Sequence, residues 1–308
     1  MHSQASKYSW LIILLVCSTA FGANINDILN RAEQAERHVS YRGIKQVIVR
    51  SGNGKPLSAK MKVLHIKPDK NRTEYLAPSA LAGVVFVRTS RGSCQYDPHE
   101  KLWKATPHCS VQCDDQVSEN LLRHYLVRLE GTKQIADREA YLVTAFPRHK
   151  GEPSHRFWID KQTYLVVGSE TIAGDGTLLR SYRFVSLELN PKDVNPSLFD
   201  VRASIKSSSE RNTRLNFRVR KPSYLPVGYK LVDARTSHIN GQPCSHLRFS
   251  NGVNTISLFQ RRAEKNSGRS AFVVRATNVV SWTKDGMLFT LLGDLSRPEL
   301  ERIARSVK

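Results

Sequence analysis

The sequence predicts an α+β protein built from two antiparallel-sheet domains, and three observations lead to this fold class. Most segments after residue 40 carry apolar side chains at every second position, the period of a β-strand. Helical spacing is found in three short segments, near residues 24–39, 118–131 and 295–308. Between residues 190 and 213, two Asn-Pro steps and three consecutive serines interrupt the pattern, as is typical of a linker.

The first residues predict export from the cytoplasm. Lys7 precedes the apolar run "WLIILLVC", and Ala20 and Gly22 supply small side chains before a cleavage site after Gly22. This pattern is typical of a cleaved signal peptide, and the run is too short to span a bilayer comfortably. A lipoprotein anchor on Cys17 is the alternative. We therefore expect a signal peptide over 1–22, a first domain over 23–203, a linker over 204–213 and a second domain over 214–308.

The first domain is predicted to begin with an amphipathic helix. Asn24 or Asn26 can cap this helix over residues 24–39, and a second helix is expected to start at Ser118 and to end at Gly131. Strands are expected at 44–51, 59–66, 72–77, 83–89, 93–97 and 101–105, and then at 139–146, 155–160, 163–171 and 177–189. The result is a large, mostly antiparallel sheet with two helices.

The second domain is predicted to be a smaller antiparallel sheet that ends in a helix. It is expected to start near residues 221–232, and its strands are expected at 245–250, 254–262, 271–276, 278–284 and 287–293. Ser296 starts the terminal helix, and Ile303, Ala304 and Val307 form its apolar stripe. We expect this helix to pack on the sheet.

The net charge predicts an anionic partner. The chain carries a formal charge of +20, and removal of Lys7 with the signal leaves +19. From Arg211 onward the charge is +12, so the excess is concentrated in the second domain. For an exported protein, lipid head groups, lipopolysaccharide phosphates or an acidic protein domain are the expected partners, rather than nucleic acid. Simple solubility is the alternative explanation.

Four cysteines remain after removal of the signal. Cys94, Cys109 and Cys113 lie close in sequence, and an exported chain favours a disulfide among them. His99 and His108 lie nearby, but the spacing matches no strong zinc pattern, so we expect no metal. Cys244 is either a free thiol or an interdomain partner. No catalytic or cofactor-binding motif was found, and we expect neither enzyme activity nor a cofactor.

The hairpin over residues 156–171 is apolar on both faces near its turn. Phe157 and Ile159 alternate with Trp158, and the returning strand is apolar on both faces as well. Two interpretations are open: a sheet packed on both sides by helices, loops or the second domain, or a curved sheet whose concave face lines a cavity.

The whole mature chain resembles the sigma-E factor regulatory proteins RseB and MucB of the bacterial periplasm. The resemblance is carried in the first domain by "YRG", "GTKQIADREAYLV", "FWIDKQTYLV" and "DGTLLRSYRF". In the second domain it is carried by "PSYLPVGYKL", "HLRFSNGVNTISLF" and "LLGDLSRPELERIA". The resemblance implies a first domain similar to the lipoprotein carriers LolA and LolB, an unclosed β-barrel with helices on its concave side. It also implies binding to the periplasmic part of a membrane-anchored anti-sigma factor, and release by lipid-like signals such as lipopolysaccharide.

Two sets of site residues follow from the strand pattern and the charge. Residues expected to line a cavity for an acylated ligand are Val85, Val87, Phe157, Ile159, Tyr164 and Val166, although the inward face of the sheet could be the opposite one. Residues expected on a basic partner surface are Arg218, Arg220, Lys221, Arg261 and Arg262. A carrier of lipoproteins or lipids is the alternative function, and the sequence leaves the formation of a homodimer open.

Overall fold

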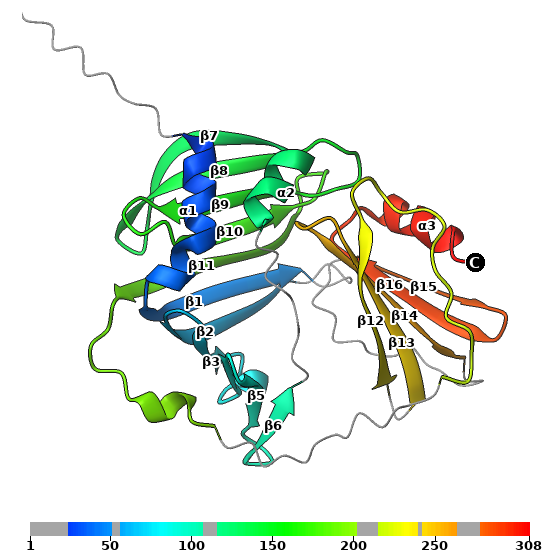
Figure 1. Cartoon of the computed structure of the whole chain (residues 1–308), viewed down its shortest axis with the longest axis horizontal. Coiled ribbons are helices and arrows are strands. Elements are labelled where there is room, and N and C mark those ends of the chain that lie inside the picture. Colours follow the sequence, from blue (N-terminus) through cyan, green and yellow to red (C-terminus); the bar gives the residue numbers. More distant parts are fainter. Residues whose placement is uncertain (1–23, 51–55, 107–115, 202–214, 240–241, 264–277) are drawn as a thin grey trace, which may run out of the picture.

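The large sheet of the first domain has eleven strands in two meanders that meet at the centre. A computed structural model describes residues 24–50, 56–106, 116–201, 215–239, 242–263 and 278–308. The strand order is β6-β5-β4-β3-β2-β1-β11-β10-β9-β8-β7, and the edge strands β6 and β7 do not pair, so the sheet is not closed (Figure 1). The strands are β1 (Tyr41–Arg50), β2 (Pro56–Ile66), β3 (Lys70–Ala77), β4 (Val85–Thr89), β5 (Gly92–Asp97), β6 (Leu102–Thr106), β7 (Tyr125–Ile135), β8 (Arg138–Pro147), β9 (Ser154–Asp160), β10 (Val166–Ile172) and β11 (Leu178–Leu189).

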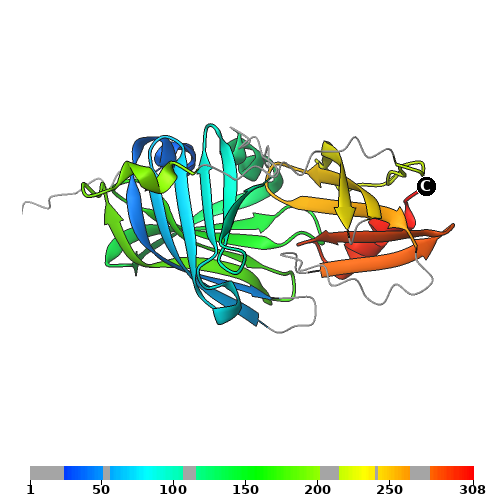
Figure 2. The same ribbon diagram turned by 90° about the horizontal axis from the view of Figure 1, so that it is seen from below.

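Two helices, α1 (Ile25–His38) and α2 (Val117–His124), lie across one half of this sheet (Figure 1). The side chain of Asn24 caps α1 by accepting from the backbone of Asn26, at 3.0 Å, as expected for one of the two candidate caps. Ile28 and Leu29 of α1 and Leu121 of α2 are buried together against β8 and β9. The sheet is strongly curved, with the helices on its concave side (Figure 2).

The second predicted helix is shorter than its apolar pattern indicated. α2 ends at His124, and β7 begins at Tyr125 and pairs with β8 along its whole length. Leu126 and Leu129, which fall within the predicted helix, are instead exposed on this edge strand. The register shifts between Leu129 and Gly131, so Gly131 marks a β-bulge rather than the end of a helix.

The second domain is a five-stranded antiparallel sheet covered by one helix. The strand order is β12-β13-β14-β16-β15, and α3 packs on the sheet at β15 and β16. Leu300 and Ile303 of α3 are fully buried against Phe289 and Leu291 of the sheet, as predicted. The elements are β12 (Lys230–Ile239), β13 (Gln242–Ser250), β14 (Thr255–Arg262), β15 (Asn278–Lys284), β16 (Met287–Gly293) and α3 (Arg297–Arg305). The expected fold class, a large unclosed antiparallel sheet and a smaller sheet with a C-terminal helix, is confirmed.

Several polar contacts join the two domains. The backbone N–H of Ser296, which precedes α3, donates to the carbonyl oxygen of Gly151 in the loop between β8 and β9, at 2.8 Å. Arg180 of β11 forms an ion pair with Asp294 of the second domain. The expected signal peptide and the expected linker over 204–213 lie outside the described residues. The described residues contain no helix long and apolar enough to cross a membrane.

Candidate functional site

Three of the predicted cavity-lining residues lie beneath the helices of the first domain. Phe157, Ile159 and Val166 belong to a cluster that also holds Ile28 and Leu29 of α1. Ile159 is 1% exposed, so the protein's own helices fill the space in front of it. At this half of the sheet, the concave face is therefore a packed core.

Tyr164 occupies a turn rather than a strand. Its backbone is left-handed, with φ of 62°, and it lies between β9 and β10. The guanidinium of Arg31 on α1 lies 5.0 Å from the centre of the Tyr164 ring, and Arg31 Nη1 donates to the Tyr164 hydroxyl at 3.4 Å. Tyr164 thus ties α1 to the sheet.

The predicted lining residues Val85 and Val87 lie on the face away from the helices. Direct pairing places Phe86 opposite Thr73, and Thr73 opposite Val63, which clusters with Ala35 of α1. Because neighbours across a strand pair share a face, the helix-side residue of β4 is Phe86. Val85 and Val87 instead pack under the 3-10 helix Pro196–Phe199. Val85 and Val87 therefore lie on the opposite face of the sheet from Phe86, and their role in ligand binding stays a prediction.

The helix-side face continues beyond the helices onto β1, β2, β3 and β4. Pairing sets Lys45 opposite Met61, and Met61 opposite Tyr75, in a row across the sheet. The Tyr75 and Phe86 rings meet edge to face, with centroids 6.1 Å apart. All four side chains are only half-buried, so this row offers an apolar surface that the cavity prediction missed. The sequence signal for this surface was the alternation along β4, in which Phe86 points to the opposite face from Val85 and Val87.

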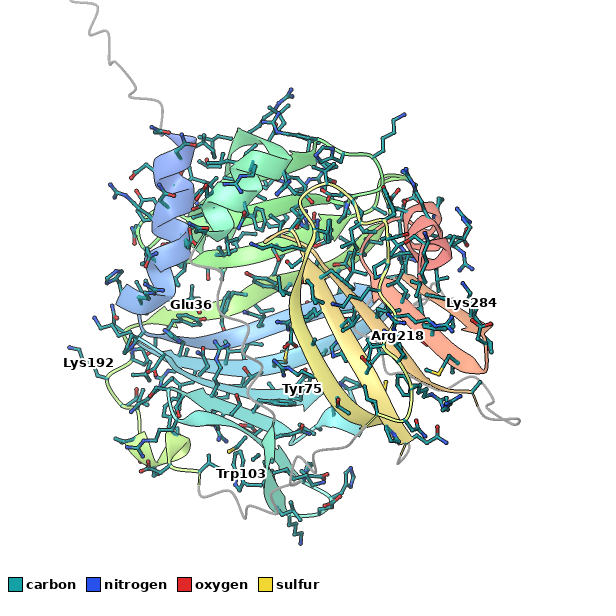
Figure 3. All side chains as sticks on the ribbon, turned by 45° about the vertical axis from the view of Figure 1, so that its right-hand side comes forward. Glu36, Tyr75, Trp103, Lys192, Arg218 and Lys284 are labelled. Carbon is teal, nitrogen blue, oxygen red and sulfur yellow. The ribbon has the colours of Figure 1, made fainter. Side chains whose placement is uncertain are left out.

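Lys45 is the charged group on this surface. Its ammonium lies 4.3 Å from the Tyr182 ring centre and 4.8 Å from that of Phe184. Burial lowers the pKa of Lys45, and the carboxylate of Glu36 at the end of α1 acts in the opposite direction. Figure 3 shows Glu36 on α1 and Tyr75 on the strands beside it. A ligand with an acidic head and an apolar body would match these groups.

A basic groove of about 930 Å³ lies in the second domain, and we call it the basic groove throughout. Figure 3 marks two of its residues, Arg218 and Lys284. Its lining is Phe217, Arg218, Val219, Arg220, Lys221, Arg262, Lys284, Asp285, Met287 and Lys308. Six of these ten side chains are cationic and one is acidic, so the groove favours an anionic partner.

Hydrogen bonds hold the segment that lines the basic groove against the sheet. The fully buried side chain of Gln260 on β14 accepts from the backbone N–H of Arg220 and donates to its carbonyl oxygen, each at 2.8 Å. Arg220 Nη1 lies 2.7 Å from Asp285 Oδ2, and Arg262 Nη2 donates to the carbonyl oxygen of Asn216 at 3.1 Å. Arg218 and Lys221 have no acidic partner among the described residues, so their charge is available to a ligand.

Four of the five predicted partner residues line the basic groove, and one does not. Arg218, Arg220, Lys221 and Arg262 lie together in it. Arg261 is 3% exposed, because successive residues of β14 point to opposite faces. It therefore takes no part in the surface. Sequence reasoning missed Lys284 and Lys308, which come from β15 and the end of the chain, because only the fold brings them beside Arg218.

The predicted cysteine pairing falls largely outside the described residues. Cys94 lies on β5, whereas Cys109 and Cys113 belong to the part that the structure leaves out. Cys244 is buried in the sheet of the second domain, and its thiol donates to the carbonyl oxygen of Ser245 at 3.5 Å. Within the described ranges, no cluster of three or more histidine, cysteine or acidic side chains could hold a metal ion.

Comparison with known families and curated proteins gives consistent matches. The model described as the MucB/RseB N-terminal domain matches residues 24–208, and the MucB/RseB C-terminal domain matches residues 212–308. The Sigma-E factor regulatory protein RseB of Salmonella typhimurium is 23% identical over 186 residues, covering 58% of this chain and 57% of that protein. The Sigma factor AlgU regulatory protein MucB of Pseudomonas aeruginosa is 22% identical over 196 residues, covering 60% of each. The matched part is therefore less than two thirds of the length of these relatives.

Solved structures share the fold over nearly the whole chain. The Pseudomonas aeruginosa MucA/MucB complex contains a chain that is 21% identical, with a TM-score of 0.67, covering 92% of this chain and 98% of that chain. A crystal structure of MucB is 19% identical, with a TM-score of 0.62, covering 91% and 96%. At this level of identity, the likeness concerns the fold.

Proposed function

Because the chain belongs to the MucB/RseB family, we propose that it is a periplasmic regulator that binds the periplasmic part of a membrane-anchored anti-sigma factor. The observation that carries this proposal is the basic groove, in which Arg218 and Lys221 lack acidic partners among the described residues. Two facts about relatives support it: curated members are named sigma factor regulatory proteins, and MucB has been solved together with the periplasmic part of MucA. The partner would place an acidic segment in the basic groove.

The chemistry of the groove argues for a peptide rather than a small anion. The cations are spread over four segments: residues 217–221, the strand β14, the strand β15, and the last residue of the chain. The apolar side chains of Phe217, Val219 and Met287 lie between them. An extended segment with alternating acidic and apolar side chains can satisfy both kinds of group, whereas a lone phosphate can satisfy only the charges.

The partner is tested by recovery from envelope extract with the full-length tagged protein. We expect a single-span membrane protein to co-purify, and we expect the double charge reversal R218E/K221E to reduce its recovery at least tenfold. The matched control is K133E/K192E, which reverses two exposed charges of the first domain. Mass spectrometry identifies the captured protein. Equal recovery by both double variants, or recovery of lipoproteins alone, would contradict the proposal.

We further propose that the helix-side face around Tyr75 and Phe86 binds an acylated ligand, with Lys45 facing its acidic head. A twelve-carbon chain that is fully buried gains about 10 kcal/mol, at about 0.8 kcal/mol per methylene group. This gain is large enough to support specific binding after the entropy losses of association. In the regulator, such a ligand would be a signal that changes partner binding.

A periplasmic carrier of lipoproteins or lipids is the second candidate function, and the same apolar face favours it. The two functions differ in what the basic groove does. A regulator with reversed charges at Arg218 and Lys221 should lose its protein partner and keep its acylated ligand. A carrier should be indifferent to that change, because its cargo lies in the first domain.

A further inference from the structure

The junction between the two domains contains a buried acidic side chain that has no counter-ion among the described residues. Glu152 lies in the loop between β8 and β9 and is 3% exposed. Its Oε1 accepts from Asn251 Nδ2 of the second domain at 3.1 Å. Its Oε2 is buried and has no hydrogen-bond partner in the part of the chain that the structure describes. An ionised carboxylate that is buried in this way is strongly unfavourable, because no cation replaces its lost hydration.

The charged and titratable groups around Glu152 do not neutralise it. From the first domain, Tyr125 and the neutral ring of His155 face the junction; from the second domain, Tyr229, Asp294 and Glu299 approach it. The Glu299 carboxylate adds repulsion. The nearby cation, Arg180, is already paired with Asp294. The surroundings therefore favour the neutral form of Glu152.

A second set of hydrogen bonds crosses the junction beside Glu152. Asn254 Nδ2 donates to the hydroxyl oxygen of Tyr125 at 2.6 Å. The amide oxygen Oδ1 of Asn254 is therefore turned toward His155, whose Nε2 donates to it at 3.2 Å. Thr171 Oγ1 completes the chain by donating to His155 Nδ1 at 3.3 Å. Burial lowers the pKa of His155 to about 4, and Arg180 acts in the same direction, so this histidine is neutral near pH 7. These bonds position the two domains but do not supply a charge for Glu152.

Two glycines allow the domains to approach this closely. Gly228 and Gly252 of the second domain both have φ of 84°, and a Cβ atom on either would collide with α2. At Gly228 it would lie 2.2 Å from the ring of His124, and at Gly252 it would lie 2.2 Å from the amide of Asn120. The close packing of these two glycines against α2 therefore helps to specify the relative orientation of the domains.

We propose that Glu152 makes this junction a proton-operated latch, which is closed while the carboxyl group is protonated and is released when it ionises. The latch is a property of the chain itself, and it does not depend on the proposed partner or ligand. Its chemistry is the transfer of one proton between Glu152 and solvent. Release would free the basic second domain to turn relative to the large sheet.

The direction of the pH dependence follows from the environment of Glu152. Burial raises its pKa from 4.5 to about 7, while the neighbouring polar groups of Tyr125 and Asn251 act in the opposite direction. In an open junction the carboxyl group is solvated and has its ordinary pKa. The proton thus binds more tightly to the closed form, so closure is favoured at low pH. The ratio of closed to open molecules should fall roughly tenfold per pH unit as the pH rises from about 5 to about 7.

Amide hydrogen exchange of the full chain, followed by NMR, tests the latch at the Ser296 N–H, which donates to Gly151 across the junction. After correction for the intrinsic exchange rate, we expect its protection to fall about tenfold per pH unit over this range in the wild-type protein. The variant Glu152→Gln keeps the shape and cannot ionise, so its protection should stay constant. The control Glu139→Gln, at an exposed site on β8, should behave as the wild type does.

A pH-independent protection factor in the wild-type protein would overturn the proposal, and so would a parallel decline in Glu152→Gln. A second pair of variants tests the close approach without titration. Gly228→Ala should lower the protection of Ser296 at every pH, whereas Gly176→Ala, which has the same φ of 84° but no atom within 4 Å, should leave it unchanged. Equal effects of these two substitutions would show that backbone strain alone is responsible, and would refute the contact.

Discussion

Individual residues decide whether a charge in this protein is structural or available to a partner. Asp160 is 1% exposed and accepts from Arg138 Nε at 2.7 Å and Nη2 at 3.0 Å, so its charge is used in an ion pair between the end of β9 and the start of β8. It also accepts from the backbone and hydroxyl of Thr163 in the turn. Arg218 and Lys221 have no such partner among the described residues, so their charges are available to a binding partner.

Removal of the Asp160 charge should destabilise the first domain. In Asp160→Asn we expect the free energy of unfolding to fall by about 3 kcal/mol, because Arg138 loses its partner in a mostly buried place. Burial alone would raise the pKa of Asp160, but the bonds from Arg138 and Thr163 outweigh it and hold that pKa below its ordinary value. This contribution is therefore present above pH 4 and is lost as the pH falls further.

Urea unfolding at pH 7 measures the change. Asp175→Asn is the matched control, because Asp175 also accepts from a turn backbone N–H, at 2.9 Å from Thr177, but lies at an exposed hairpin end. The free energy of unfolding of Asp175→Asn should fall much less, because solvent screens this exposed carboxylate. A similar loss for the two variants would mean that turn geometry, and not the buried ion pair, accounts for the stability.

At the scale of elements, the alternation of apolar residues predicted the strands well but left two features undecided. The segment 118–131 has leucines at helical spacing, yet β7 begins at Tyr125 because pairing with β8 satisfies its backbone. The two apolar faces of β4 are indistinguishable in sequence, and only pairing with β3 shows that Phe86 faces the helix side. Local pattern fixes the period of an element, whereas its end and its inward face depend on its neighbours.

The assignment of faces on β4 predicts the behaviour of two adjacent variants. Phe86→Ala should weaken the binding of a fluorescent dodecanoate about tenfold, because a half-buried aromatic ring on the helix side is lost. Val87→Ala removes a side chain from the cluster under Pro196–Phe199, so it should lower stability by about 1–2 kcal/mol and leave the affinity unchanged. Fluorescence titration measures the affinity of both variants for the dodecanoate. If Val87→Ala lost more affinity than Phe86→Ala, the assignment of the two faces of β4 would be contradicted.

At the scale of the whole molecule, the concentration of positive charge in the last third of the sequence predicted a basic surface, and four of its residues are in the basic groove. Composition could not indicate that Lys284 and Lys308 join them, nor that the domains meet through Glu152, Asn251 and Asn254. Such contacts link residues about a hundred positions apart, and no local pattern encodes them. The apolar face and the basic groove thus lie in different domains, joined by a junction that responds to protons.

The most direct test of the regulator proposal is site-specific photo-crosslinking in intact cells. A photoreactive amino acid at position 221, in the basic groove, should crosslink the full-length protein to a single-span membrane protein, and the same amino acid at the exposed position 133 should not. Mass spectrometry of the adducts identifies the partner. Crosslinking of that membrane protein from position 133 with none from position 221 would contradict the assignment of the basic groove as the partner site.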